Sequence, residues 1–269
     1  MHFVLFTALL AAASNSTLLD KRSVLSFNPV LEDMPVVSRS NAVVPRHLEL
    51  TNAKRFSLGL PPNPPKIRAT SSKFAPRAGP SGRPGQPTAG CLKICDASDG
   101  ASLGYVSRTL NSFGEYGATT SSGQELKVQA DTSTAGAINV GTTNSPDASF
   151  PYLVGITGFA NNANGLREGE FNYVYIGAGG QTAVGATPRA ETNSFSIATG
   201  NPEAIESAIF VFEPSLNLSP FWINGDGSKP TVYLGLYENA LFLTGDKSAF
   251  TRTFGPATWV TMTFEPDFN

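Results

Sequence analysis

Short runs of alternating apolar and polar residues fill the chain from Cys91 to Asn269, and Gly, Asn, Asp, Ser and Thr separate them. Successive side chains of a strand point to opposite faces, so this alternation is typical of strands with one buried face. The pattern predicts strands over residues 92–96, 102–108, 125–131, 136–141, 152–157, 172–177, 193–197, 207–213, 220–224, 231–237, 240–243 and 257–264.

Turn residues interrupt these runs at intervals of roughly eight to twelve positions, which is typical of sandwiches and jelly rolls. We therefore predict an all-β domain over residues 91–269, built as an antiparallel β-sandwich or jelly roll. A domain of this length can bury one sizeable core. One short helix is expected over residues 246–253, where Asp246 could cap the first turn and Gly255-Pro256 would end the helix.

The first two predicted strands are joined by Asp99-Gly100. Asp-Gly between two alternating runs favours a two-residue hairpin turn, in which both central residues take positive φ. The domain is therefore expected to begin with a tight hairpin.

The first 90 residues lack a sustained apolar period. Residues 1–13 are predicted to be a secretory signal peptide, because Phe3 to Ala13 is an apolar run too short to span a bilayer and ends in three alanines. Residues 14–90 are predicted to be a disordered, basic, proline-rich arm, with eight prolines between positions 61 and 90. Such a composition buries too little apolar area to offset the entropy of ordering the backbone.

Two dibasic pairs lie in the arm, at Lys21-Arg22 and Lys54-Arg55. In a secreted protein they could be processing sites, which would make part of the arm a propeptide. Exposed basic residues that only interact with water explain the same pairs, and the sequence leaves both interpretations open.

Charge is distributed unevenly between the arm and the domain. Residues 1–90 hold 11 Lys/Arg and 4 Asp/Glu, a net +7, and residues 91–269 hold 8 and 17, a net −9. An acidic domain argues against nucleic-acid binding, which depends on Lys and Arg. Beyond the predicted signal peptide, no uninterrupted apolar stretch is long enough to span a membrane. We therefore predict an exported, extracellular protein without a membrane span.

Histidine is absent from residues 91–269, since the only two histidines are His2 and His47. A Ser-His-Asp triad, a Cys-His pair and a His-ligated zinc site are thereby excluded from the domain. Cys91 and Cys95 would lie about 13 Å apart on one extended strand, too far for a disulfide. Cys95 is expected to be a small buried apolar side chain, and the role of Cys91 is left open.

The loop Asn224-Gly225-Asp226-Gly227-Ser228 is the candidate ligand site. It follows Trp222, so a ligand there could meet an aromatic ring together with the oxygens of Asn224 and Asp226. Asp226 is also a candidate calcium ligand, although the acids of an EF-hand are missing. A plain turn in which Asn and Asp bond their own backbone explains the same residues. No cofactor is predicted, with calcium as the alternative.

Two pairs of carboxylates could in principle hydrolyse glycosides, namely Glu168 with Glu170 and Glu203 with Glu206. Catalytic pairs normally come from different strands, so neighbours in sequence carry little weight. We interpret these glutamates as solvated loop acids and assign no catalytic residue.

Several longer stretches resemble a known family. The arm sequence TNAKRFSLGLPPNPPK is similar to a module that recurs in secreted proteins of mushroom-forming (basidiomycete) fungi. The domain resembles a family of such proteins through DASDGASLGYVSRTLNSFGEYG, SPDASFPYLVGITGF, ESAIFVFEP, FWINGDGSKPT and LTGDKSAFTRTFG. The resemblance covers nearly the whole chain and implies a secreted fungal protein. The family has no established activity, so it assigns no role to any residue here.

Three functions are compatible with these observations. The first is a non-enzymatic β-sandwich module of the fungal surface or extracellular matrix that binds a glycan or another cell-wall component. The second is a carboxylate-dependent glycan hydrolase or lyase, and the third is a structural or interaction protein without a small ligand. A concave aromatic patch with amide groups would favour the first, and two facing carboxylates about 5 to 9 Å apart would favour the second.

Overall fold

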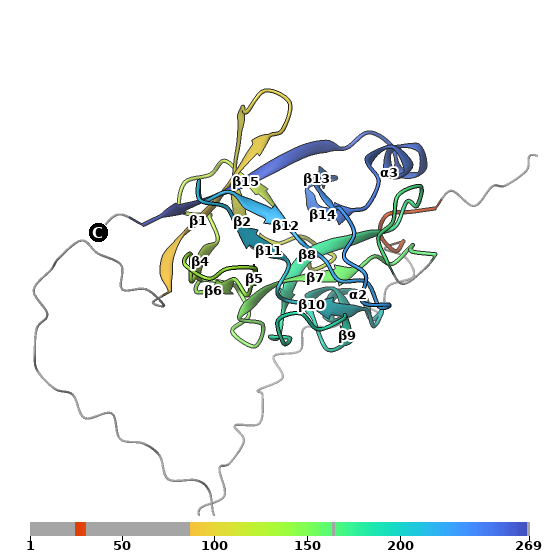
Figure 1. Ribbon diagram of the computed structural model, residues 1–269, viewed down its shortest axis with the longest axis horizontal. Coiled ribbons are helices and arrows are strands. Elements are labelled where there is room, and N and C mark those ends of the chain that lie inside the picture. Colours follow the sequence, from red (N-terminus) through yellow and green to blue (C-terminus); the bar gives the residue numbers. More distant parts are fainter. Residues whose placement is uncertain (1–24, 31–86, 163–164, 268–269) are drawn as a thin grey trace, which may run out of the picture.

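Eight strands of the domain form a closed antiparallel ring (Figure 1). The computed structural model describes residues 25–30, 87–162 and 165–267. Around the ring the order is β15-β13-β14-β8-β7-β6-β4-β1, and β1 pairs back onto β15 with Cys91 opposite Glu265. The bounds are β1 Thr88–Asp96, β4 Lys127–Ala130, β6 Gly141–Thr142, β7 Tyr152–Thr157, β8 Tyr173–Gly179, β13 Tyr233–Tyr237, β14 Ala240–Thr244 and β15 Thr258–Pro266.

The remaining elements extend this barrel or cover it. Strands β2 and β3 continue the sheet from β1, β10 and β9 continue it from β7, and β12, β11 and β5 form a separate three-stranded sheet. Their bounds are β2 Ser102–Leu110, β3 Tyr116–Thr119, β5 Ala137–Ile138, β9 Arg189–Ala190, β10 Ala204–Glu206, β11 Phe210–Phe212 and β12 Leu218–Pro220. The helices are α2, Ser194–Thr199, and α3, Lys247–Phe254.

The prediction of an all-β antiparallel domain is confirmed, but its arrangement differs from a sandwich of two facing sheets. The pairing of β1 with β15 closes the main sheet on itself. A closed sheet has no free edge strand, whereas a sandwich keeps its edges. Closure depends on pairing between distant strands, which the alternation of apolar residues does not encode.

Two apolar clusters occupy opposite faces of the same strands. In β8, Val174 and Ile176 belong to a cluster with interior residues of β1 and β4, while Tyr173 and Tyr175 belong to a second cluster with Phe250 of α3. The first cluster fills the barrel, and the second lies between its outer wall and the helices. This is why every residue of β8 is buried.

Of the two short helices, one was predicted from the sequence and the other was predicted to be a strand. Helix α3 is confirmed, with Asp246 capping it by accepting from the amides of Ser248 and Ala249. The strand predicted over residues 193–197 is wrong, because this segment forms most of α2. Asn193 and Ser196 form a reciprocal capping box there, and Gly200 ends the helix with φ 77°.

The hairpin between β1 and β2 forms, but its turn is longer than the predicted two residues. Strand β1 ends at Asp96 and β2 begins at Ser102, with the amide of Gly100 donating to the carbonyl of Asp96 at 2.9 Å. Gly100 has φ 75°, whereas Asp99 is not among the described residues with positive φ. The prediction of positive φ at both positions is therefore wrong for Asp99.

Both cysteines are free, and the prediction that Cys95 is buried is wrong. Cys91 is buried, and Cys95 is only partly buried. Cys91 lies where β1 is paired on both sides, with β15 and β4. Cys95 instead lies at an irregularity in the pairing with β2.

The predicted signal peptide (1–13) and most of the predicted arm (14–90) lie outside the described residues. Two parts of the arm are described, and both are packed against the domain. Strand β1 already begins at Thr88, and residues 25–30 place Phe27 in the outer aromatic cluster. No helix within the described ranges has the length and hydrophobicity needed to cross a bilayer.

Candidate functional site

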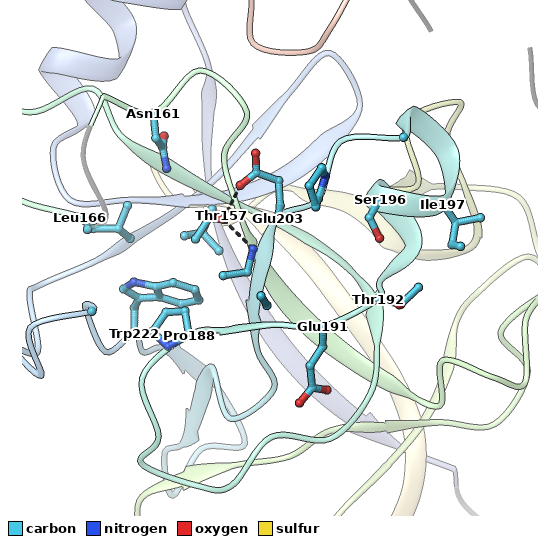
Figure 2. Close-up of a pocket in the computed structure, with 17 residues that line it drawn as sticks. Thr157, Asn161, Leu166, Pro188, Glu191, Thr192, Ser196, Ile197, Glu203 and Trp222 are labelled. Carbon is cyan, nitrogen blue, oxygen red and sulfur yellow. Dashed lines mark hydrogen bonds between the residues drawn. The ribbon is translucent and has the colours of Figure 1, made fainter. Parts of the chain in front are cut away.

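A cleft of about 780 Å³ lies where β7 ends and β8 begins (Figure 2). Thr157 and Val174, which pair across these two strands, both line it. The remaining walls come from β9, β10, helix α2 and the segment around Trp222. The cleft therefore opens at one end of the barrel, a common position for ligand sites in barrels.

The cleft is lined by both apolar and polar side chains. The apolar side chains are those of Leu166, Val174, Pro188, Ile197 and Trp222, and the polar ones are those of Thr157, Asn161, Glu191, Thr192, Ser196 and Glu203. No Lys or Arg is among the described residues that line it. Such a cleft suits an uncharged or cationic ligand and disfavours an anion.

Some of the polar side chains of the cleft make hydrogen bonds that hold the fold together. Asn161 donates to the carbonyl of Tyr173 at 2.8 Å and accepts from its amide at 2.9 Å. Ser196 belongs to the capping box of α2. These two residues therefore fix the shape of the cleft and leave little hydrogen-bonding capacity for a ligand.

Glu203 is the polar group best placed for a ligand. Its Oε2 accepts from the hydroxyl of Thr157 at 2.6 Å, and that hydroxyl in turn accepts from the amide of Ala204 at 3.1 Å (Figure 2). Its Oε1 accepts no hydrogen bond from the described residues. Burial raises the pKa of the Glu203 carboxyl, and the bond from Thr157 partly offsets this. Thr157 thus orients the carboxyl and leaves one oxygen free to accept from a ligand.

The second carboxylate of the cleft does not face the first. Glu191 lies on the same lining, but Figure 2 shows its carboxylate pointing away from Glu203. Hydrolysis of a glycosidic bond needs an acid and a second carboxylate on either side of the bond. The arrangement therefore provides hydrogen bonding to a ligand and lacks the facing pair.

The structure does not bring the three predicted site residues together. Trp222 is among the residues that line the cleft, yet it is 1% exposed and is mainly a core residue beside Gly155. Asn224 and Asp226 instead line a second, more open hollow.

The side chains of Asn224 and Asp226 already form hydrogen bonds or an ion pair with neighbouring residues. The Asn224 side chain accepts from the amide of Leu166 at 2.7 Å and donates to its carbonyl at 3.0 Å. Asp226 accepts from Ser228 and forms an ion pair of 2.7 Å with Arg167. The loop is thus held as a turn, as in the alternative interpretation of the sequence. Within the described residues, no group of three His, Cys, Asp or Glu side chains could hold a metal ion.

The four glutamates considered as possible acids have different environments. Glu168 is exposed and Glu170 is partly buried. Glu203 lies in the cleft, while Glu206 is completely buried. The interpretation of all four as solvated loop acids is therefore wrong for Glu206.

Glu206 is a buried carboxyl with few partners. It lies opposite Gly155 in the pairing of β10 with β7, and its Oε2 accepts from the amide of Ile223 at 3.1 Å. Its Oε1 has no hydrogen-bond partner among the described residues. Burial raises the pKa of Glu206 to about 7, because the charged form loses its hydration.

Glu191, Thr157 and Asn161 were missed by the sequence analysis. Each is an ordinary polar residue in a loop or at a strand end. The pairing of β7 with β8 and β10, and of β10 with β9, brings them together.

The chain matches no known protein-family model, and no curated protein or solved structure is significantly similar to it.

Proposed function

We propose that the protein is a secreted, non-enzymatic β-domain protein of a fungal surface or extracellular matrix, and that it binds an uncharged glycan in the cleft at the end of the barrel. The observation that carries this proposal is that apolar side chains and Oε1 of Glu203, which no described residue binds, line one cleft with no Lys or Arg among its described lining residues. Secretion and fungal origin rest on the predicted signal peptide and on the family resemblance.

The chemistry of a sugar fits the mixed lining of this cleft. A pyranose ring has C–H faces that pack on apolar surfaces and hydroxyls that donate to carboxylates. Pro188 and Ile197 supply the solvent-accessible apolar contacts, and Glu203 supplies the acceptor. Leu166 and Trp222 are each 1% exposed, so stacking on the ring of Trp222 is not part of the proposal.

A glycan hydrolase or lyase is the alternative, and the geometry favours it less. Glu203 has the raised pKa that a general acid needs. However, the carboxylate of Glu191 points away from it (Figure 2). A structural protein without a small ligand remains the third function, and it predicts no binding in the cleft.

A glycan array probed with the full chain, followed by calorimetric titration of the best ligand, tests the proposal. Glu203→Gln keeps the shape of the side chain and removes its charge, so it should weaken binding by roughly tenfold or more. Glu168→Gln is the matched control, because Glu168 is exposed and lies outside the cleft.

Three results would count against the proposal. Absence of binding to any glycan would favour the structural protein. Equal loss of affinity in both variants would place the ligand elsewhere. Release of new reducing ends from the bound glycan, abolished by Glu203→Gln, would favour the hydrolase.

A further inference from the structure

A six-residue segment, Leu25–Val30, lies against the outer wall of the barrel on the same side as α3 (Figure 1). It forms neither helix nor strand. Phe27 and Asn28 are 3% and 7% exposed, whereas the end residues Leu25 and Val30 are 44% and 56% exposed. The segment is therefore anchored by its central residues, as a short bound peptide is.

The ring of Phe27 is enclosed by other aromatic rings. Tyr173 stacks on it with ring centroids 4.6 Å apart, and five further rings meet it at 5.1 to 5.9 Å, mostly edge to face. These rings come from strands β8, β13 and β14 and from helix α3, and they belong to Tyr173, Tyr175, Tyr237, Phe242, Phe250 and Phe254. We call this enclosure the aromatic socket.

Polar groups of the socket recognise the peptide backbone next to the ring. The carbonyl of Phe27 accepts from the hydroxyls of both Tyr173 and Tyr175, each at 2.5 Å. Buried hydroxyls normally have a partner, and here a carbonyl of a distant segment supplies it. The socket thus fixes both a ring and the carbonyl that follows it.

The next residue is recognised through its side-chain amide. The Nδ2 of Asn28 donates to Oε2 of Glu115 at 3.3 Å, and Asn111 donates to the same oxygen at 2.7 Å. Glu115 is completely buried, and its Oε1 has no partner among the described residues. Within the same residues, Oδ1 of Asn28 also lacks a partner. The carboxylate of Glu115 therefore favours an amide donor such as Asn at this position, although the amide oxygen stays unpaired.

The way in which this segment is held is that of a ligand. It pairs with no strand of the described chain, so its attachment rests on the ring and carbonyl of Phe27, the side-chain amide of Asn28 and the buried Pro29. If it left, the socket would expose several aromatic faces, two phenol hydroxyls and a carboxylate, which is the composition of a peptide-binding pocket. The segment also lies between the dibasic pairs Lys21-Arg22 and Lys54-Arg55, so cleavage at both would turn it into a separate peptide.

We infer that the aromatic socket is a peptide-binding site for an aromatic residue followed by Asn, and that Leu25–Val30 is its replaceable occupant. The same segment, supplied as a separate peptide, binds the barrel in trans. This site is distinct from the cleft proposed for glycans, since the two share no residue that contacts a ligand.

Full-chain protein with a protease recognition sequence inserted after Arg55 gives the first test. After cleavage, the N-terminal fragment should co-elute with the barrel on gel filtration. An excess of the synthetic peptide LSFNPV should displace it, and LSANPV should not. Separation of the fragment from a barrel that keeps its near-ultraviolet circular dichroism would overturn the inference.

Full-chain Phe27→Ala gives the second test, with fluorescein-labelled LSFNPV as the probe. The variant should bind the probe at least about tenfold more tightly than the wild-type chain, whose own segment competes at an effective concentration on the order of millimolar. Leu25→Ala is the matched control and should bind like the wild type, because Leu25 is exposed. A folded Phe27→Ala chain that fails to bind the probe would overturn the inference.

If Phe27→Ala does not fold, addition of the peptide gives the test. Millimolar LSFNPV should then restore the near-ultraviolet circular dichroism, and failure of this rescue would overturn the inference. Asn28→Ala removes the hydrogen bond to Glu115, so the chain's own segment should be held less tightly. The labelled peptide should then replace this segment in the socket faster than it does in the wild type. An unchanged rate of replacement in that variant would overturn the claim that the socket recognises Asn after the aromatic residue.

Discussion

Replacing Glu206 with glutamine should remove a pH-dependent penalty from the stability of the barrel. The carboxyl is completely buried, and its pKa is raised from 4.5 to about 7. Between these values the folded state holds a proton that the unfolded state has lost. The contribution of Glu206 to the free energy of unfolding is therefore largest below pH 4.5. It decreases as the pH rises towards 7 and stays constant above that.

The size of the effect follows from the two pKa values. A change of one pKa unit corresponds to about 1.4 kcal/mol, so Glu206 should contribute a loss of about 3 kcal/mol between pH 4 and pH 8. Glutamine keeps an oxygen that can accept from the amide of Ile223 and cannot ionise. The difference in unfolding free energy between variant and wild type should therefore shift by about 3 kcal/mol in favour of the variant over that range.

Urea denaturation from pH 4 to pH 8, followed by the fluorescence of Trp222 and Trp259, measures this difference. Glu115 has a similarly raised pKa of about 7, but it is present in both proteins and cancels. A difference that stays constant across the pH range would refute the reasoning, because it would mean that Glu206 ionises in the folded state as easily as in water.

Two further predictions concern the turn after β1 and the loop after Trp222. Gly100→Val should cost about 1–3 kcal/mol from the backbone alone, since φ is 75° and an added Cβ would contact nothing within 4 Å. Thermal melting checks this, with Gly100→Asn as a milder control, and an unchanged melting temperature would contradict the assigned turn. Trp222→Ala should destabilise the domain by about 3–5 kcal/mol as a buried truncation. Asp226→Ala should leave the free energy of unfolding nearly unchanged, because its ion pair is exposed, and a large loss would indicate a tightly held loop.

Local patterns predicted the elements whose own residues determine them. The run from Tyr152 to Thr157 is short, mostly apolar and flanked by turn residues, and it forms β7 with the predicted bounds. Asp246 and Gly255 delimit α3, because a capping side chain and a residue of unusual φ act within one turn of chain.

Helix α2 shows how a local pattern can mislead. Ser194, Phe195, Ser196 and Ile197 alternate as a strand would, while Asn193 and the residue three positions later carry the capping signal. The capping bonds outweigh a period-two pattern that extends over only four residues.

The features that decide function come from distant parts of the chain. Glu203 reaches the cleft through β10 pairing with β7, and Phe27 meets tyrosines about 150 positions later. Neither Leu25–Val30 nor the polar loop residues have a local pattern that indicates burial. The candidate cleft and the aromatic socket could not be predicted from the sequence for this reason.

The closure of the barrel by β1 and β15 also determines when the domain can fold during synthesis. The other strands of the ring leave the ribosome before β15 does. Cys91 can pair with Glu265 only after about 170 further residues have been synthesised. Until then one edge of β1 lacks the partner that shields it. Folding is therefore expected to finish only after β15 has emerged, and a nascent chain stalled before Thr258 should remain sensitive to protease and prone to pairing with other copies.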